Sequence, residues 1–303
     1  MSQLNIDKTV SSGNYVDHNF PRVESFTREN IGGYLRYILL NNRKVLTTDS
    51  SGDQLLNAVF YGSRDLTLCN DNIVSYYYLQ LKIAALLVLD YREFQWFFLK
   101  NDMNMHHNNK AFSKRLYKKV GPMLKLVNQD AYYFFEQEFE EYNNREVRNR
   151  LLIDSGYHNK AIKNFNMYLR NDNAYTKLRD SLLRINLDYI NKDIYKDKVD
   201  GKYDVVLLSG LSTKLTLSKF VDLVKYLDAN NLNEEAILIL VYLWNNNIYT
   251  PDYANVWKNI YANPLSNKVI NKYVSTVYSL SGYKNYLWED NKREDKVFIY
   301  CKK

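Results

Sequence analysis

Two apolar runs in the second half of the chain constrain the fold more than any other feature. Residues 202–211 (KYDVVLLSGL) and 234–244 (EEAILILVYLW) are short, nearly continuous stretches of mostly aliphatic side chains. Strands that helices cover on both faces have this pattern, and they belong to parallel sheets. The sequence therefore predicts an α/β protein with a mostly parallel sheet.

The first half contains a strand, a helix and a second strand in close succession. Residues 44–48 (KVLTT) and 65–69 (DLTLC) have the composition of strands. Between them, residues 55–60 carry apolar side chains at helical spacing, and Gly62 is the expected helix stop. Such a βαβ unit has a right-handed crossover and places its two strands parallel in one sheet.

Other segments continue the alternation. Residues 27–40 are predicted to form a leading helix with Thr27 as its cap, because Thr favours this position and Glu29 follows in the first turn. Residues 101–183 have a helical pattern too long for an ordinary crossover, so we expect a helical insertion over the ligand-binding edge of the sheet. The remaining predicted elements are helical segments at 73–89, 90–99 and 217–227, a strand at 185–194 and an antiparallel closing strand at 295–301.

Composition favours a soluble, cytoplasmic protein. Cys69 and Cys301 are far apart in the sequence and form neither a disulfide framework nor a CxxC metal clamp. The first residues lack the basic and apolar pattern of a signal peptide, and no stretch reaches the roughly 18 apolar residues of a spanning helix.

The formal net charge is +7, and basic residues concentrate at 110–125 and 145–150. A surface of this kind is either a solvated helix face or a contact for nucleic acid or an anionic membrane. The acidic residues at 136–141 blunt the local field, which favours the solvated face and argues against nucleic acid. Peripheral contact with an anionic membrane stays open.

Polar residues follow each predicted strand, where ligands of open α/β sheets bind. Small residues in the first turn let backbone N–H groups approach a ligand, and Asp49 and Asp53 are candidates to hold an ammonium group. A carboxylate or amide after the second strand suits a ribose diol, and one after the third suits an adenine amino group. The candidates are Asp49, Ser50, Ser51, Gly52, Asp53 and Gln54 after the first strand, Asn70, Asp71 and Asn72 after the second, Asp193 after the third, and Ser209 and Gly210 after the fourth.

The first turn has a single glycine, Gly52, in place of the GxGxxG pattern of dinucleotide-binding proteins. No pyrophosphate cradle is therefore predicted. The composition of the turn favours a ligand with an adenosine but no phosphate, although a purely structural tight turn explains it nearly as well.

Residues 45–98 resemble the cofactor region of the S-adenosylmethionine:diacylglycerol 3-amino-3-carboxypropyl transferases of betaine-lipid synthesis. The family's serine/glycine/aspartate turn corresponds to residues 51–54, and its acidic residue and asparagine correspond to 70–72. Its leucine/lysine/alanine stretch corresponds to residues 81–85, followed by Tyr91 and Phe94. The ribose-binding carboxylate of the family falls on Asn70, with Asp71 one place later, and its Trp-Glu-Asp motif before the first strand is missing.

The resemblance implies a Rossmann-like domain that binds S-adenosylmethionine, within the class I methyltransferase-like folds. It also implies transfer of a 3-amino-3-carboxypropyl group to a small-molecule or lipid acceptor, whereas the fold as a class favours methyl transfer. The expected organisation is an N-terminal helical segment at 1–43, the first half of the domain at 44–100, the helical insertion at 101–183 and the second half at 184–303.

No catalytic residue is predicted, because a sulfonium is already activated and the enzyme mainly positions the acceptor. No metal site is expected either, since His106 and His107 have no acidic or cysteine ligand at a chelating spacing. The alternative function is a non-catalytic, degenerate domain that binds a partner or a membrane, supported by Asn70 in place of a carboxylate.

Overall fold

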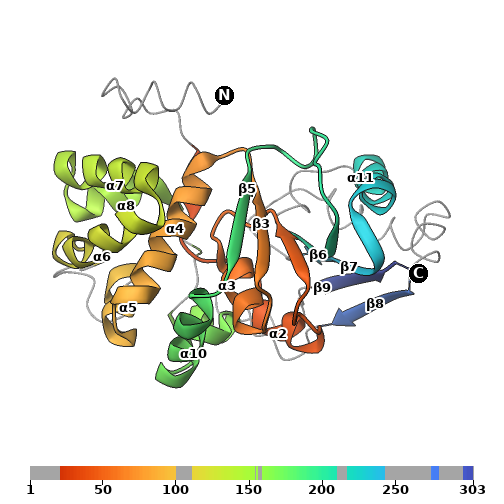
Figure 1. The fold of residues 1–303 in the computed structure, drawn as a ribbon, viewed down its shortest axis with the longest axis horizontal. Helices are drawn as coiled ribbons and strands as arrows, with labels where there is room; N and C mark the ends of the chain where they lie inside the picture. The colour runs from red at the N-terminus through yellow and green to blue at the C-terminus, as the bar shows by residue number, and fades with distance from the viewer. Residues whose placement is uncertain are drawn as a thin grey trace, which may run out of the picture. The chain divides into compact units, whose positions relative to one another are not determined.

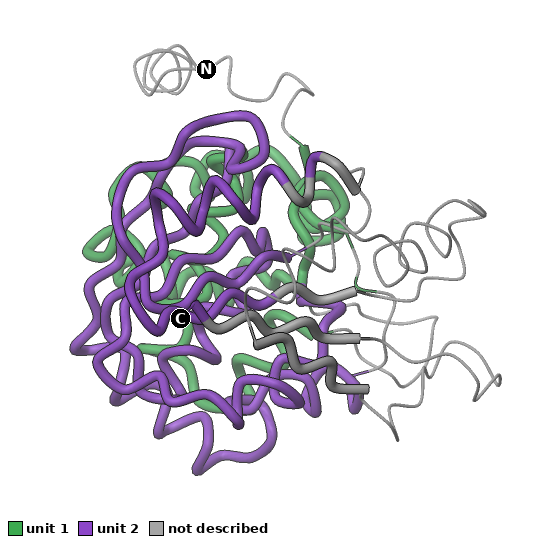
Figure 2. Tube along the Cα trace, turned by 90° about the vertical axis from the view of Figure 1, so that its right-hand side faces the viewer, with its two compact units in different colours: residues 1–25, 72–155 green, residues 26–71, 156–303 purple. Residues whose placement is uncertain are grey.

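The computed structural model describes residues 21–99, 111–153, 155, 159–209, 217–242, 274–279 and 296–302. The chain forms two compact units (Figure 2). Unit 1 contains Met1–Ser25 and Asn72–Ser155, and unit 2 contains Phe26–Asp71 and Gly156–Lys303. The segment predicted as one helical insertion, 101–183, is thus divided between the two units.

Unit 2 contains a seven-stranded sheet in the order β5-β3-β2-β6-β7-β9-β8 (Figure 1). Its strands are β2 (Lys44–Thr47), β3 (Asp65–Cys69), β5 (Asn186–Ile190), β6 (Tyr203–Leu208), β7 (Leu232–Tyr242), β8 (Val274–Ser279) and β9 (Lys296–Cys301). All neighbours from β5 to β7 pair in parallel, and β9 runs antiparallel to β7 and β8. The predicted α/β fold with an antiparallel C-terminal strand is confirmed.

The apolar runs form the centre of this sheet. Val205, Val206, Leu207 and Leu208 of β6 are fully buried, as a strand between two layers of helices requires. The edge strand β5 instead has only exposed and half-buried residues. When the strands of this sheet are numbered by their order in the chain, they lie side by side as third, second, first, fourth and fifth, which is the doubly wound arrangement. The reversed last strand lies between the fifth and sixth strands, so the fold is a Rossmann-like α/β fold whose last strand runs antiparallel to both of its neighbours.

The segment before β2 differs from its prediction. The helix expected at 27–40 is wrong: only α2 (Ile31–Tyr34) and the short 3-10 helix η1 (Leu35–Tyr37) form. Asn30 caps α2 by accepting from the Gly33 N–H, while Thr27 Oγ1 accepts from the Glu29 N–H. The remaining helices of unit 2 are α3 (Asp53–Phe60), α9 (Asn159–Phe165), η2 (Met167–Leu169), α10 (Asp172–Leu182) and α11 (Leu217–Asn230).

Unit 1 is mainly helical, with an aromatic core. Its elements are α4 (Ile73–Val88), α5 (Tyr91–Phe98), α6 (Lys114–Val127), α7 (Gln129–Glu141), α8 (Asn144–Leu151) and the parallel pair β1 (Val23–Glu24) and β4 (Leu152–Ile153). Phe97 stacks on Phe112 with ring centroids 5.1 Å apart, and Tyr117 stacks on Phe139 at 4.2 Å. Burial of Phe134, Phe135 and Phe139 shows that the phenylalanines of α7 serve packing. No helix of the described residues combines the length and apolarity needed to cross a bilayer.

Candidate cofactor-binding site

The candidate site lies where the chain reverses its direction of travel across the sheet, between β2 and β6. From β2 the sheet grows toward β3 and β5, and from β6 it grows toward β7. Open α/β sheets bind ligands at this switch point, outside the carboxyl ends of the strands. Thr48 and Ser209 meet there, since the Ser209 N–H donates to Thr48 Oγ1 at 2.9 Å.

The turn after β2 is organised around the carboxylate of Asp49. One oxygen of Asp49 accepts from the Ser51 N–H at 3.0 Å, and the other accepts from the Gln54 N–H at 2.9 Å. Ser51 Oγ also donates to Asp49 and accepts from the Asp53 N–H. Gly52 has a φ of 75°, which glycine adopts without strain.

This geometry gives a physical reason for the missing phosphate cradle. In dinucleotide-binding proteins the N–H groups of this turn and of the following helix bind a phosphate. Here the carboxylate of Asp49 accepts from two of them, and its side chain is 1% exposed. The turn therefore already contains an anion, supplied by the protein.

Asp53 and Gln54 connect this turn to distant segments. Asp53 accepts from the Thr27 N–H at 2.7 Å and from the Tyr168 hydroxyl at 3.0 Å. Asp49, Ser51, Asp53 and Gln54 are all buried, whereas Ser50 is half-buried. The prediction that Asp49 and Asp53 hold a ligand ammonium stays a prediction, and both already have hydrogen-bond donors within the protein.

A further carboxylate, Glu29, belongs to the same cluster and escaped sequence reasoning. One oxygen accepts from Ser209 Oγ at 2.8 Å, and the other accepts from Gln54 Nε2 at 2.7 Å and from the Tyr34 hydroxyl at 3.1 Å. Glu29 thus joins the turn after β2 to the end of β6, and it is 1% exposed. Its local pattern resembles the first turn of any helix, so only the tertiary structure reveals it.

Burial and repulsion between neighbouring carboxylates raise the pKa values of Glu29 and Asp49 in this cluster. Burial, helped by the nearby charge of Asp49, raises the pKa of Glu29 from 4.5 to about 8. The pKa of Asp49 is raised as well, by burial and by the charge of Asp53. A cation placed beside these carboxyl groups would favour their charged forms, so the cluster is suited to a positively charged ligand.

The residues after β3 divide into two environments. Asn70 is half-buried and donates from Nδ2 to the Thr48 carbonyl at 3.2 Å, while Asp71 is exposed. Asn72 belongs to unit 1, where it is the cap of α4 and accepts from the Val74 N–H. The structure therefore brings Asn70 to the end of β2 and leaves Asp71 facing solvent.

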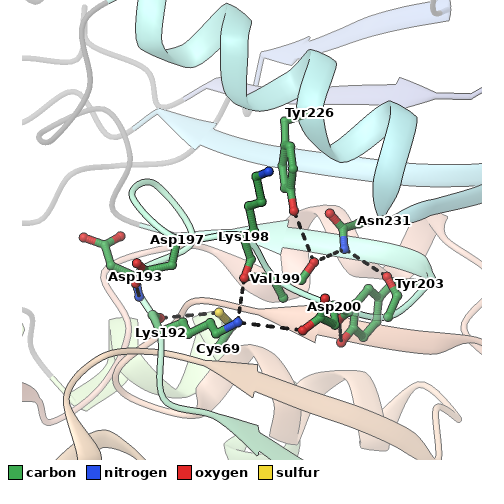
Figure 3. Close-up of polar contacts among 11 residues, drawn as sticks. Cys69, Lys192, Asp193, Asp197, Lys198, Val199, Asp200, Tyr203, Tyr226 and Asn231 are labelled. Atoms are coloured by element: carbon green, nitrogen blue, oxygen red, sulfur yellow. Dashed lines mark hydrogen bonds and ion pairs between the residues drawn. The ribbon is translucent and has the colours of Figure 1, made fainter. Parts of the chain in front are cut away.

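Asp193 lies in the turn after β5 (Figure 3). Its carboxylate accepts from the Tyr195 N–H at 3.0 Å and pairs with Lys196 Nζ at 2.7 Å. The Tyr195 hydroxyl donates to the Ser209 carbonyl at 3.4 Å, which links this turn to the end of β6. Gly210 lies outside the described residues, so Ser209 is the last candidate that the structure places.

The chain between β5 and β6 is held by side chains that donate to its backbone carbonyl groups (Figure 3). The Val199 carbonyl accepts from Asn231 Nδ2 at 2.7 Å, and the Lys198 carbonyl accepts from Lys192 Nζ at 2.7 Å. The Cys69 thiol donates to the Lys192 carbonyl at 3.5 Å, and burial raises its pKa to about 12. A thiol with so high a pKa is not a nucleophile at neutral pH.

Metal chemistry finds no support in the part of the chain that the structure describes. Its His, Cys, Asp and Glu side chains form no group of three that could hold an ion. His106 and His107 lie outside that part.

No protein-family model matches the chain, and no curated protein does. Among solved structures, a possible exported protein from Bordetella parapertussis is 10% identical, covers 93% of this chain and 70% of its own, and has a TM-score of 0.39. A methyltransferase from Pyrococcus furiosus is 11% identical, with coverages of 99% and 97% and a TM-score of 0.37. A putative S-adenosylmethionine dependent methyltransferase from Listeria monocytogenes is 10% identical, with coverages of 90% and 99% and a TM-score of 0.38. The strand order and register, rather than these likenesses, define the fold.

Proposed function

We propose that this protein is an S-adenosylmethionine-dependent transferase that binds its cofactor at the switch point between β2 and β6. The observation that carries the proposal is the position of Asp49, whose carboxylate already accepts from the Ser51 and Gln54 N–H groups. A phosphate group at this turn would be repelled by the Asp49 carboxylate. An adenosyl ligand with a positive charge and no phosphate fits this environment.

Each part of such a ligand has a candidate partner. Asn70 and Asp71 offer an amide and a carboxylate to a ribose diol, and Asp193 offers a carboxylate to an adenine amino group. The buried carboxylate of Asp49 would attract the sulfonium and ammonium charges of such a ligand, and a bound cation would in turn favour the charged form of Glu29.

S-adenosylmethionine supplies an activated carbon next to sulfur, so the protein has only to orient the acceptor and exclude water. The transferred group is either methyl or 3-amino-3-carboxypropyl. Incubation with labelled cofactor distinguishes them, because methyl transfer leaves S-adenosylhomocysteine and aminocarboxypropyl transfer leaves 5′-methylthioadenosine.

Calorimetric titration of the full chain with S-adenosylmethionine, together with unfolding measurements in its presence, tests the proposal. At about 100 times its dissociation constant the ligand should add roughly 2.7 kcal/mol to the free energy of unfolding. Asn70→Ala should weaken binding, and the matched control Asn186→Ala, at the amino end of the edge strand β5, should not. The proposal would be overturned if S-adenosylmethionine produced no binding heat and no stabilisation. It would also be overturned if ATP stabilised the protein equally.

Asn70 also supports the alternative of a non-catalytic binding domain. An amide replaces the carboxylate expected for ribose, and it is engaged with the Thr48 carbonyl. In that case the titration gives no binding, and replacing Asn70 by aspartate restores it.

A further inference from the structure

Helix α6 of unit 1 presents cations along one side. Its charged residues are Lys114, Arg115, Lys118, Lys119 and Lys125, all exposed, and none of its residues is acidic. The opposite side of the helix packs into the core through Leu116, Tyr117, Val120 and Leu124. Residues three and four apart lie on the same side of a helix, so the cations form two adjacent rows.

Large apolar side chains lie next to these cations. Leu126 is 82% exposed, and it continues the row that begins with Arg115 and Lys119. Trp96 of α5 is 52% exposed and lies one turn after Glu93, which forms an ion pair with Lys119. We call the α6 face the surface made by the five cations of α6 with Leu126 and Trp96.

We propose that the α6 face docks this protein on a lipid bilayer that contains anionic lipids. Cations beside exposed tryptophan and leucine are the features with which proteins bind the headgroup region, where the cations meet lipid phosphates and the apolar tips enter the acyl boundary. This inference is independent of the proposed cofactor.

Two observations favour a bilayer over nucleic acid. A phosphate backbone offers no partner for the apolar side chain of Leu126, and Arg115 is the only guanidinium among the cations, the remainder being lysines. The exposed acidic residues Asp130 and Glu140 of α7 limit the docking surface to α6 and α5.

Flotation of the full chain with phosphatidylcholine vesicles, with and without phosphatidylserine, tests the contribution of the cations of the α6 face. Binding is expected only with phosphatidylserine. Each lysine near an anionic surface contributes about fivefold to the affinity, so Lys114→Gln with Lys118→Gln should weaken binding about 25-fold. The matched control Lys202→Gln with Lys225→Gln removes exposed lysines of unit 2 and should leave binding unchanged.

The contribution of the apolar side chains is tested with Leu126→Ser at high salt, where the attraction between the cations and the lipids is screened. Binding to the phosphatidylserine vesicles should fall about tenfold, the scale of burying one leucine side chain. An unchanged melting temperature shows that these exposed substitutions leave the fold intact. The proposal is overturned by absence of vesicle binding, by equal losses in the lysine control, or by duplex DNA binding tighter than vesicles and insensitive to Leu126→Ser.

Discussion

The turns after the neighbouring strands β2 and β3 bring acidic residues to one edge of the sheet but use them differently. After β2, Asp49 and Ser51 are buried, and their side chains accept from backbone N–H groups of the same turn. After β3, Asn70 is half-buried and Asp71 is exposed. A polar residue at a strand end is thus either part of the architecture or available to a ligand, and burial decides which.

The largest difference between the two turns should appear in stability. Asp49→Ala leaves the N–H groups of Ser51 and Gln54 buried without an acceptor, at about 1 to 3 kcal/mol each. Urea unfolding should show the summed loss. The matched variant Asp71→Ala should change the unfolding free energy by less than about 0.5 kcal/mol. Equal effects of the two variants would contradict the distinction.

The buried cluster should also make stability depend on pH. The pKa of Glu29 is higher in the folded protein than its ordinary 4.5, so the folded state holds a proton that the unfolded state releases. Its contribution is fully present below pH 4.5 and is lost as pH rises through 8, roughly 5 kcal/mol in total. Glu29→Gln, which mimics the protonated form, should flatten this dependence in a pH series of unfolding curves. The control Glu234→Gln, at an exposed site, should keep the wild-type slope.

The exposed turn should matter for ligand affinity instead. If Asp71 holds the ribose, Asp71→Ala weakens S-adenosylmethionine binding by about 1 to 3 kcal/mol, the scale of a charged hydrogen bond. Calorimetry on the variant measures this directly. If Asp71→Ala has no effect and Asn70→Asp tightens binding, the ribose site lies at Asn70 and has degenerated.

The smallest expected effect is the loss of stability when the hydrogen bond to the Asn70 carbonyl is removed. The Tyr189 hydroxyl donates to the Asn70 carbonyl at 2.8 Å. Tyr189→Phe removes that hydrogen bond and should lower the unfolding free energy by about 0.5 to 1.5 kcal/mol. A loss as large as that of Asp49→Ala would mean that the turn after β3 is as structural as the turn after β2.

Sequence reasoning succeeded where local pattern and tertiary packing agree. The apolar runs became β6 and β7, and the boundaries of β3 were predicted at both ends. The strand β8 (VSTVYS) carries β-branched residues, a signal hidden among the polar residues around it. The pair β1 and β4 has two residues in each strand, too few for any periodicity.

The helix expected at 27–40 shows why some elements and site residues could not be predicted from the sequence. Its first residues have a good helix start, but the Thr27 N–H donates to Asp53 and Glu29 accepts from Gln54, 26 and 25 residues away in sequence. These long-range hydrogen bonds compete with the first turn of a helix. The same contacts create the Glu29 cluster, so the wrong helix and the missed site residue have one cause.

The central claim is that Asp49 takes the place of a ligand phosphate, and comparing adenosine with adenosine 5′-phosphate tests it most directly. Both affinities are measured by calorimetry on the full chain. We predict that the phosphate weakens binding, since a like charge about 4 Å from a carboxylate costs about 1 to 4 kcal/mol at dielectric constants from bulk water to a protein surface. Tighter binding of adenosine 5′-phosphate would contradict the account.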